Sequence, residues 1–267
     1  MEKGRATVRR IILFITIIFA FTAFVIMFRY MMAKAPTSIT AQKTTALTPQ
    51  VTTKPEKTVN FNSEQFTYAY FIVQNPAGLS LIPNFSGSVD TQTIISDHAC
   101  LYAINGGFYD KQNKPLGFFQ VGSEIYGPQI DSNLVNGFLW ADATGSAVIS
   151  TELPQIQFRF AVQTGPMLLV DSTVLPLAIN NDTHARRMVA AKIMDNRLVF
   201  LTIYTGESAF EGPLLDDLPG VIQAVRIKEN LNITDAVNLD GGSASAFYNE
   251  DTRLSELTPV GSIFCVK

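Results

Sequence analysis

The chain has 267 residues, of which 47% are hydrophobic and 16% charged, and it contains 19 Phe and 8 Tyr. This apolar content supports one folded domain and argues against a chain that is disordered throughout. Two cysteines are too few for a disulfide scaffold, and a formal net charge of −3 offers no basic surface for nucleic acid.

The N-terminal segment predicts a membrane anchor. Residues 11–28 carry no charge, and after one arginine the apolar run continues to residue 33, which is long enough for a transmembrane helix at 11–33. Basic residues in 1–10 predict that this tail stays in the cytoplasm and that the rest of the chain is exported from a cell membrane crossed once. The alternative is a cleaved signal peptide and a secreted domain, because Ala33-Lys34-Ala35 resembles a cleavage site, although Pro36 follows it.

A flexible stalk is predicted over residues 34–60. This segment is rich in Thr, Pro, Gln and Lys and has almost no large apolar side chains, so it cannot offset the entropy lost on ordering. Residues 61–267 then form a single domain. Nine of the 20 basic residues but only two of the 23 acidic residues lie in 1–60, so the net charge of the domain is near −10. An anionic ligand would need a local cationic pocket there.

The domain is predicted to be α+β: a strand-rich mixed sheet domain with few helices. Short apolar runs separated by Gly, Asn, Asp and Pro predict strands at 66–73, 101–104, 116–121, 137–141, 158–162, 167–170 and 236–239. Residues 188–204 read as a hairpin that turns at Asp195-Asn196.

One helix is predicted near residues 218–231. Asp216 or Asp217 is a candidate N-cap, and Pro219 suits the first turn. Leu218, Val221, Ile222 and Val225, with Leu231 at the end, form the apolar stripe.

Few residues offer familiar catalytic chemistry. The chain has two histidines, and it lacks the H-E-x-x-H, G-x-x-x-x-G-K-[ST], G-x-G-x-x-G and G-x-S-x-G motifs. The sequence therefore predicts no metal and no cofactor. Candidate site residues lie instead where polar residues and glycines interrupt predicted strands.

Three segments fit this description. The first is Asn105-Gly106-Gly107, where a tight turn can expose amides to an anion and Asn105 can bond a hydroxyl; the alternative is an Asx-capped turn. The second is His184 to Arg187, where one of two arginines can face a pocket and bind phosphate, or both can lie on the surface. The third is Asp240-Gly241-Gly242-Ser243, whose carboxylate can be a catalytic group or merely accept hydrogen bonds from its own turn.

Cys100 and Cys265 lie beside predicted strands in a domain that we expect to be exported. They form either one disulfide, closing a long loop, or two buried thiols.

Taken in order, INGGFY (104–109), TGPMLLVD (164–171), HARRMVAA (184–191) and AVNLDGGSAS (236–245) resemble the phosphodiester glycosidase family, over roughly residues 64–267. Arg186 matches the arginine of the family by position, rather than Arg187. Two small residues, Ala190 and Ser243, stand where the family often has glycine. The other matching positions are Asn105, Gly106, Gly107, Gly165, Pro166, Asp240, Gly241 and Gly242.

The resemblance implies hydrolysis of a sugar-1-phosphodiester or a related envelope glycan. Arg186 and the amides of the first glycine turn would then bind phosphate, and Asp240 would act at the anomeric carbon or on the attacking water, with His184 as a second candidate for proton transfer. Gly165, Gly241, Gly242 and Ser243 would line the substrate site. A second carboxylate is not identified. The rival hypotheses are a non-catalytic envelope glycan-binding module and a structural envelope protein.

Overall fold

The computed structural model describes residues 22, 24, 27 and 56–267. The predicted tail, most of the predicted anchor and nearly all of the stalk lie outside these residues. Within the described residues, no helix is long and apolar enough to cross a membrane. The chain divides into two units, Met1–Thr52 and Thr53–Lys267, and the second contains the folded domain.

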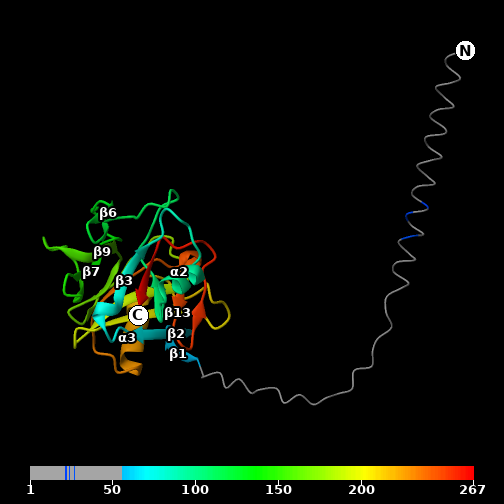
Figure 1. Ribbon diagram of the computed structural model, residues 1–267. Helices are drawn as coiled ribbons and strands as arrows, with labels where there is room; N and C mark the ends of the chain where they lie inside the picture. Colours follow the sequence, from blue (N-terminus) through cyan, green and yellow to red (C-terminus); the bar gives the residue numbers. More distant parts are fainter. Residues whose placement is uncertain (1–21, 23, 25–26, 28–55) are drawn as a thin grey trace, which may run out of the picture. The chain divides into compact units, whose positions relative to one another are not determined.

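Three sheets make up the domain, and neighbouring strands in each are antiparallel (Figure 1). The seven-stranded sheet has the order β1 (Lys57–Phe61), β2 (Glu64–Ile72), β13 (Leu198–Tyr204), β12 (Arg187–Ile193), β14 (Ile233–Asn238), β10 (Met167–Val170), β11 (Thr173–Val174). One five-stranded sheet has the order β16 (Arg253–Leu254), β15 (Phe247–Tyr248), β4 (Tyr102–Asn105), β17 (Ser262–Val266), β3 (Leu79–Pro83). The other has the order β6 (Glu124–Gly127), β5 (Phe119–Val121), β9 (Phe158–Thr164), β7 (Gly137–Asp142), β8 (Ala147–Ser150).

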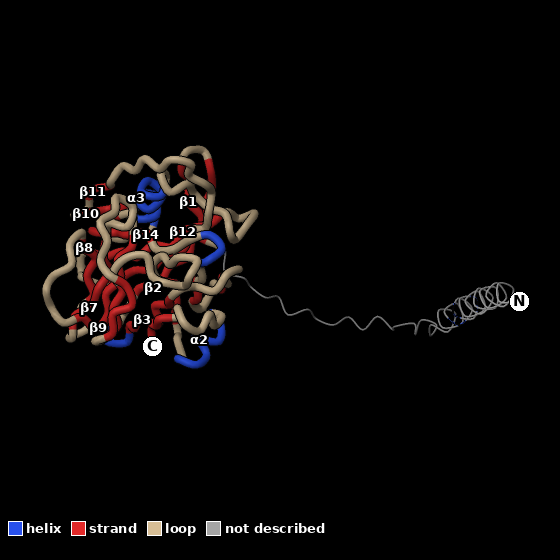
Figure 2. The backbone as a smooth tube through the Cα atoms, turned by 90° about the horizontal axis from the view of Figure 1, so that it is seen from above, coloured by secondary structure: helices blue, strands red, loops and turns tan. Residues whose placement is uncertain are grey.

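Helices are few, as Figure 2 shows. The α-helices of the domain are α2 (Thr91–His98) and α3 (Leu218–Lys228), and the short 3-10 turns are η1 (Pro76–Gly78) and η2 (Gly242–Ala244). The prediction of a strand-rich domain with few helices is therefore confirmed.

Both faces of the seven-stranded sheet are buried. Along β13, Leu198 and Phe200 point into a central core shared by the three sheets, whereas Val199, Leu201 and Ile203 point toward α3. This alternation follows from the two-residue repeat of a strand. Because both faces are covered, the strand is a continuous apolar run, and the hairpin predicted at residues 188–204 is confirmed.

The helix predicted from the apolar stripe is α3, but its cap differs from the prediction. Asp217 occupies the N-cap position without a side-chain capping bond, and its carboxylate instead accepts from Asn62 Nδ2 at 2.9 Å. The Asp216 carboxylate accepts from the Ile179 amide at 2.7 Å. Both acids tie loops to the helix start, so Pro219 and burial of the apolar face define where α3 begins.

The sequence did not predict α2, whose buried apolar residues are Ile94 and Ile95. Two neighbouring apolar residues give no helical stripe, so the signals at this helix are local. Asp90 caps its start by accepting from the Thr93 amide at 2.9 Å, and Ala99 ends it in the left-handed region at φ 53°.

Strand β1 begins at Lys57, before the boundary that we predicted at residue 61. Lys57 is opposite Tyr68 in β2, and its Nζ forms a 2.6 Å ion pair with Glu229 at the end of α3. These contacts with distant residues order a segment whose composition alone resembles a linker.

Cys100 and Cys265 form a disulfide, with their Cα atoms 5.3 Å apart. Both are buried beneath Ile94 and Ile95 of α2. Cys265 lies in β17, opposite Ala103 of β4, so the bridge joins the start of β4 to the last strand of the chain.

Candidate active site

The turns that follow β4 and β14 lie against each other. The Asp240 amide donates to the Gly106 carbonyl at 3.1 Å, and Asn105 Nδ2 donates to the Asp240 carbonyl at 2.8 Å. The first and third segments singled out in the sequence are therefore adjacent.

The backbone of Arg186 contacts the Asp240 turn. The Gly242 amide donates to the Arg186 carbonyl at 2.8 Å, and a Cβ at position 241 would lie 2.6 Å from that oxygen. Gly241 is thus required by a close approach of two backbones. Gly242 adopts φ 62°, a conformation that glycine enters without strain.

Asn105 is buried and holds the turn together. Its side chain is 1% exposed, its Oδ1 accepts from the Ala246 amide at 3.0 Å, and its Nδ2 bonds the carbonyls of Gly106 and Asp240. Its polar atoms are therefore used within the fold, and the expected contact with a sugar hydroxyl stays a prediction. The Gly106 amide donates to the Ser262 carbonyl at 2.8 Å, so it is not a free donor for an anion either.

Close packing accounts for both glycines of this turn. A Cβ on Gly106 would collide with the Ser262 hydroxyl, and one on Gly107 would lie 2.9 Å from Cγ2 of Val162. The paired glycines in the sequence therefore indicate that the turn after β4 packs closely against neighbouring strands.

Arg186 is fully buried, with an exposed fraction of 0%. Its guanidinium donates to Ser245 Oγ at 2.8 Å and to the carbonyls of Ala209 (3.0 Å), Ser255 (2.9 Å) and Ser245, and it stacks on the Phe210 ring. Burial lowers the pKa of Arg186 to about 10, so it stays cationic at neutral pH. These partners use the donors that the expected phosphate contact would need, and that contact stays a prediction.

Arg187 is also committed to the fold. It forms a 3.3 Å ion pair with Asp182 and donates to the carbonyls of Pro213 and Thr183. Burial is the main cause that lowers its pKa.

Asp240 is the carboxyl of the third segment. Its side chain is half-buried, and its Oδ1 accepts from the Gly241 amide at 2.9 Å. Burial raises the pKa of the carboxyl to about 7, outweighing the hydrogen bond from Gly241, which lowers it. A carboxyl with this pKa exchanges a proton readily near neutral pH.

Residues 255–259 form a strap beside the Asp240 turn. The Ser243 carbonyl accepts from the amides of Leu257 (2.8 Å) and Thr258 (3.1 Å), and the Tyr109 hydroxyl donates to the Pro259 carbonyl. Burial raises the pKa of Tyr109, and the charges of Asp240 and Glu256 add to that effect.

Tyr109 and Glu256 were missed in the sequence. Tyr109 ends the INGGFY segment, so its position was visible although its role was not. No pattern in the sequence pointed to Glu256. Its Oε1 accepts from the Thr91 amide at the start of α2 at 2.6 Å, a contact between residues 165 apart in the chain. Glu256 also acts electrostatically on Arg186, and together with Asp240 on Tyr109.

His184 and Ser243 are the exposed members of the predicted set. His184 Nδ1 lies 2.9 Å from the Gly212 carbonyl, and because a carbonyl only accepts, Nδ1 carries the proton and Nε2 is left for other partners. The neighbouring Ala185 Cβ lies 3.8 Å from the position of a Cβ on Gly242, which places this segment beside the Asp240 turn.

Gly165 positions a loop. Its carbonyl accepts from Asn238 Nδ2 at 2.9 Å, and its peptide bond to Pro166 is cis. A Cβ on Gly165 would collide with the carbonyl of Leu134. Gly165 therefore brings the loop at 134–136 close to Asn238 at the end of β14, two residues before Asp240.

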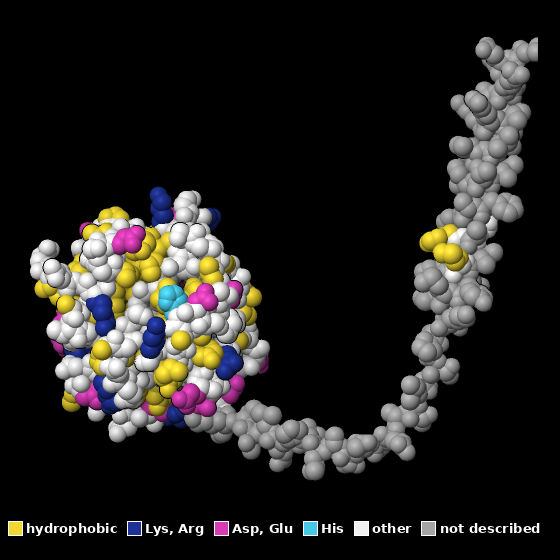
Figure 3. Space-filling view, viewed as in Figure 1, with side chains coloured by type: hydrophobic (Ala, Val, Ile, Leu, Met, Phe, Trp, Pro, Cys, Tyr) yellow, Lys and Arg dark blue, Asp and Glu magenta, His cyan; other side chains and the backbone are white. Residues whose placement is uncertain are grey.

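The face drawn in Figure 3 has acidic and basic side chains interspersed. That face therefore carries no large field of one sign to gather anionic substrates.

The sequence pattern of the phosphodiester glycosidase family matches residues 98–267. The chain belongs to this family. The matched region of this phosphodiester glycosidase domain contains the Asn105 turn, the Arg186 segment and the Asp240 turn. Strands β1 to β3 and most of α2 precede it.

Among solved structures, the domain is similar to a hypothetical protein from Synechocystis, with a TM-score of 0.60 and 14% identity, over 79% of this chain and 61% of that one. It is also similar to the zebrafish N-acetylglucosamine-1-phosphodiester alpha-N-acetylglucosaminidase catalytic domain auto-inhibited by pro-peptide, with a TM-score of 0.59 and 15% identity, over 79% and 81% of the two chains. At such identities the likeness concerns the fold. No curated protein matches the chain.

Proposed function

We propose that this domain is a hydrolase that cleaves a sugar-1-phosphodiester or a related envelope glycan at the Asp240 site. The observation that carries the proposal is a half-buried carboxyl with a pKa of about 7, held at the junction of the family's glycine turns. The zebrafish relative is named for action on an N-acetylglucosamine-1-phosphodiester, which supports a substrate of this class.

In the proposed reaction, Asp240 is the general base. It takes a proton from a water molecule whose oxygen attacks the anomeric carbon, and the bond from that carbon to the phosphate oxygen breaks. The electron pair leaves with the phosphate, which is already a stable anion and needs little protonation. Glu256 stabilises the positive charge that develops on the sugar.

The phosphate is proposed to meet the exposed Ser243, and His184, whose Nε2 has no partner in the described part of the chain and can accept a proton, is the second candidate for proton transfer. Arg186 acts indirectly. Its buried guanidinium ties Ser245 of the glycine turn to Ser255 of the strap, and so keeps the walls of the site in register.

The decisive experiment compares the parent with Asp240→Asn on a panel of sugar-1-phosphodiesters. Asn preserves the size of the side chain and the acceptor for the Gly241 amide, so turnover should fall about 10²-fold or more with the fold intact. Asp171→Asn is the matched control, because Asp171 is exposed and its left-handed backbone (φ 48°) suits Asn.

Equal turnover by the parent and Asp240→Asn would contradict the proposal. A parent that cleaves none of these diesters but binds envelope glycan would instead support the non-catalytic binding module.

We further propose that residues 11–33 anchor the protein in a cell membrane, with residues 1–10 in the cytoplasm and the domain outside, or that the domain is secreted if the segment is cleaved. The uncharged run at 11–28 supports this topology. Protease added to intact cells should release a fragment that begins within residues 34–56. Protection of the domain in that assay would reverse the orientation.

A further inference from the structure

A pocket with a volume of about 490 Å³ lies on the outer face of the sheet that contains β9. Along β9, Phe160 and Val162 point into the central core. Because side chains alternate along a strand, Gln163 points to the opposite face of the sheet. Gln163 lines the pocket. A volume of this size is in the range of about 300–1,000 Å³ that holds small ligands.

The floor of the pocket is rigidly built. Gln163 is 3% exposed, its Oε1 accepts from the Phe118 and Ile130 amides, and its Nε2 donates to the carbonyls of Ile130 and Val135. Ser132 Oγ accepts from the amide of Val135. The loop that forms one wall is therefore held in place before any ligand arrives, which lowers the entropy lost on binding.

The rim, by contrast, has unused hydrogen-bonding groups. The side chains of Gln129, Asp131 and Thr151 line the pocket and form no hydrogen bond with the described part of the chain. Asn136 uses its Oδ1 to accept from the Met167 amide at 2.8 Å, which leaves its Nδ2 free within residues 56–267. Ile130, which is 37% exposed, adds an apolar surface.

The charge of the lining limits what can bind. Asp131 is its charged residue, and no Lys, Arg or His of the described residues lines the pocket. A phosphate or carboxylate would meet a like charge and no cation, whereas the hydroxyls of a neutral sugar can bond to amide, hydroxyl and carboxylate groups together.

The pocket is coupled to the Asp240 site through two residues. The Gln163 carbonyl lies 3.3 Å from the position of a Cβ on Gly107. Thr164 Oγ1 donates to the Asn238 carbonyl at 2.8 Å, two residues before Asp240. The end of β9 thus contacts both the pocket and the segments that carry the glycine turns.

We propose that this pocket is a subsite for a neutral sugar unit of the substrate, beyond the phosphodiester that is cleaved at Asp240. That the bound sugar belongs to the substrate rests on the proposed function. Binding of a sugar to the pocket does not require turnover, so the two can be tested separately.

Trp140 provides the readout, since it is the one tryptophan of the chain. It lies on β7 at the same parity as Phe138, a lining residue, and its Nε1 donates to Ser150 Oγ beside Thr151. The full-length Asp240→Asn chain in detergent is titrated with N-acetylglucosamine while Trp140 fluorescence is followed. Calorimetry of the same samples gives a second measure of binding.

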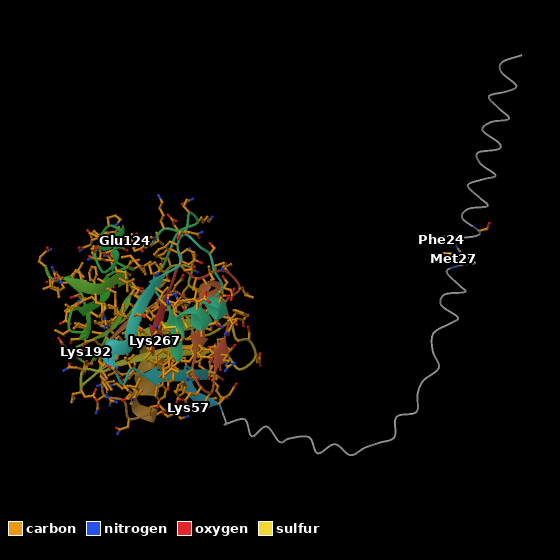
Figure 4. The ribbon with its side chains drawn as sticks, viewed as in Figure 1. Phe24, Met27, Lys57, Glu124, Lys192 and Lys267 are labelled. Carbon is orange, nitrogen blue, oxygen red and sulfur yellow. A yellow bond between two sulfur atoms is a disulfide. The ribbon has the colours of Figure 1, made fainter. Side chains whose placement is uncertain are left out.

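Saturable binding is expected, and it should weaken at least about tenfold when Thr151→Phe fills the pocket or when Asp131→Ala removes an acceptor. The controls are Glu152→Phe, next along the chain, and Glu124→Ala, an exposed acid on β6 (Figure 4). Both should bind like the parent. Glucose 1-phosphate should bind more weakly than N-acetylglucosamine.

No binding by either method, or binding unchanged by Thr151→Phe, would overturn the subsite even if the parent cleaves sugar-1-phosphodiesters. Binding that Thr151→Phe removes would support the subsite even if the parent cleaves none of them, in which case the proposed hydrolysis alone would fail.

Discussion

The side chain of Asn105 donates a 2.8 Å hydrogen bond to the backbone carbonyl of Asp240, 135 residues further along the chain. The return bond, from the Asp240 amide to the Gly106 carbonyl, is 3.1 Å long. The position of the Asp240 turn therefore depends on a buried amide from a distant segment.

Replacing Asn105 by Ala should lower the free energy of unfolding by about 2–4 kcal/mol, because the Ala246 amide and the Asp240 carbonyl lose a buried partner. Chemical denaturation measures this change. Asn133→Ala, at an exposed position, should be near neutral. Stability equal to that of the parent would show that the amide does not hold the two turns together.

Asp240→Asn should stabilise the fold above pH 7. The folded pKa of Asp240, about 7, is above its ordinary value of 3.8, so the native state holds the proton more tightly and stability falls as pH rises through this window. Asn has no charge to bury, so the free energy of unfolding at pH 8 should rise by about 1–4 kcal/mol, given 1.36 kcal/mol per pKa unit. At pH 3 the two proteins should be nearly equal, and the same stability difference at both pH values would contradict the assigned cause.

If Asp240 is the general base, kcat/KM for a sugar-1-phosphodiester should rise with pH through an apparent pKa near 7, because the charged form is the active one. The residual activity of Asp240→Asn should lack this limb. A rate that falls through pH 7 instead would make the carboxyl a general acid.

Arg186→Lys should act mainly on stability. Lys cannot reach Ser245, Ala209 and Ser255 together, so the free energy of unfolding should fall by about 2–4 kcal/mol. Because Arg186 is buried, kcat/KM should change by similar factors for substrates with and without phosphate. A loss of kcat/KM confined to phosphate-bearing substrates would instead support a direct contact between Arg186 and the phosphate. Arg197→Lys, on the surface, is the control.

Glu229 should make the domain sensitive to acid. Burial alone would raise its pKa, but hydrogen bonds from Lys57, Tyr68 and Tyr70 outweigh burial and hold the pKa at about 2. This stabilisation is complete above the ordinary pKa of 4.5 and is lost as pH falls from there toward 2. Glu229→Gln should cost about 2–3 kcal/mol at pH 7 and flatten the acid limb of stability. An unchanged acid limb would argue against this cluster.

Local patterns determined much of the fold. Continuous apolar runs predicted β13 and its hairpin partner, and the stripe from Leu218 to Val225 predicted α3, because both depend on the period at which side chains meet a core. Strand β17 was expected only as a strand beside Cys265, without bounds, because a short continuous apolar run such as Ser262–Val266 has no alternation that fixes its ends.

By itself, the sequence also indicated segments that meet at the candidate site, because the glycines at 106, 107 and 241 mark close contacts and Gly242 marks a left-handed turn. Only the tertiary structure decided what each side chain does there. Asn105 and Arg186 have the chemistry of ligand-binding residues, but neighbours from distant segments bury them and use their donors. Asp240 is desolvated by the same packing, and Glu256 is brought near by a loop that local patterns do not specify. Burial depends on contacts between residues far apart in the chain, so it sets pKa and accessibility only once the sheets have assembled.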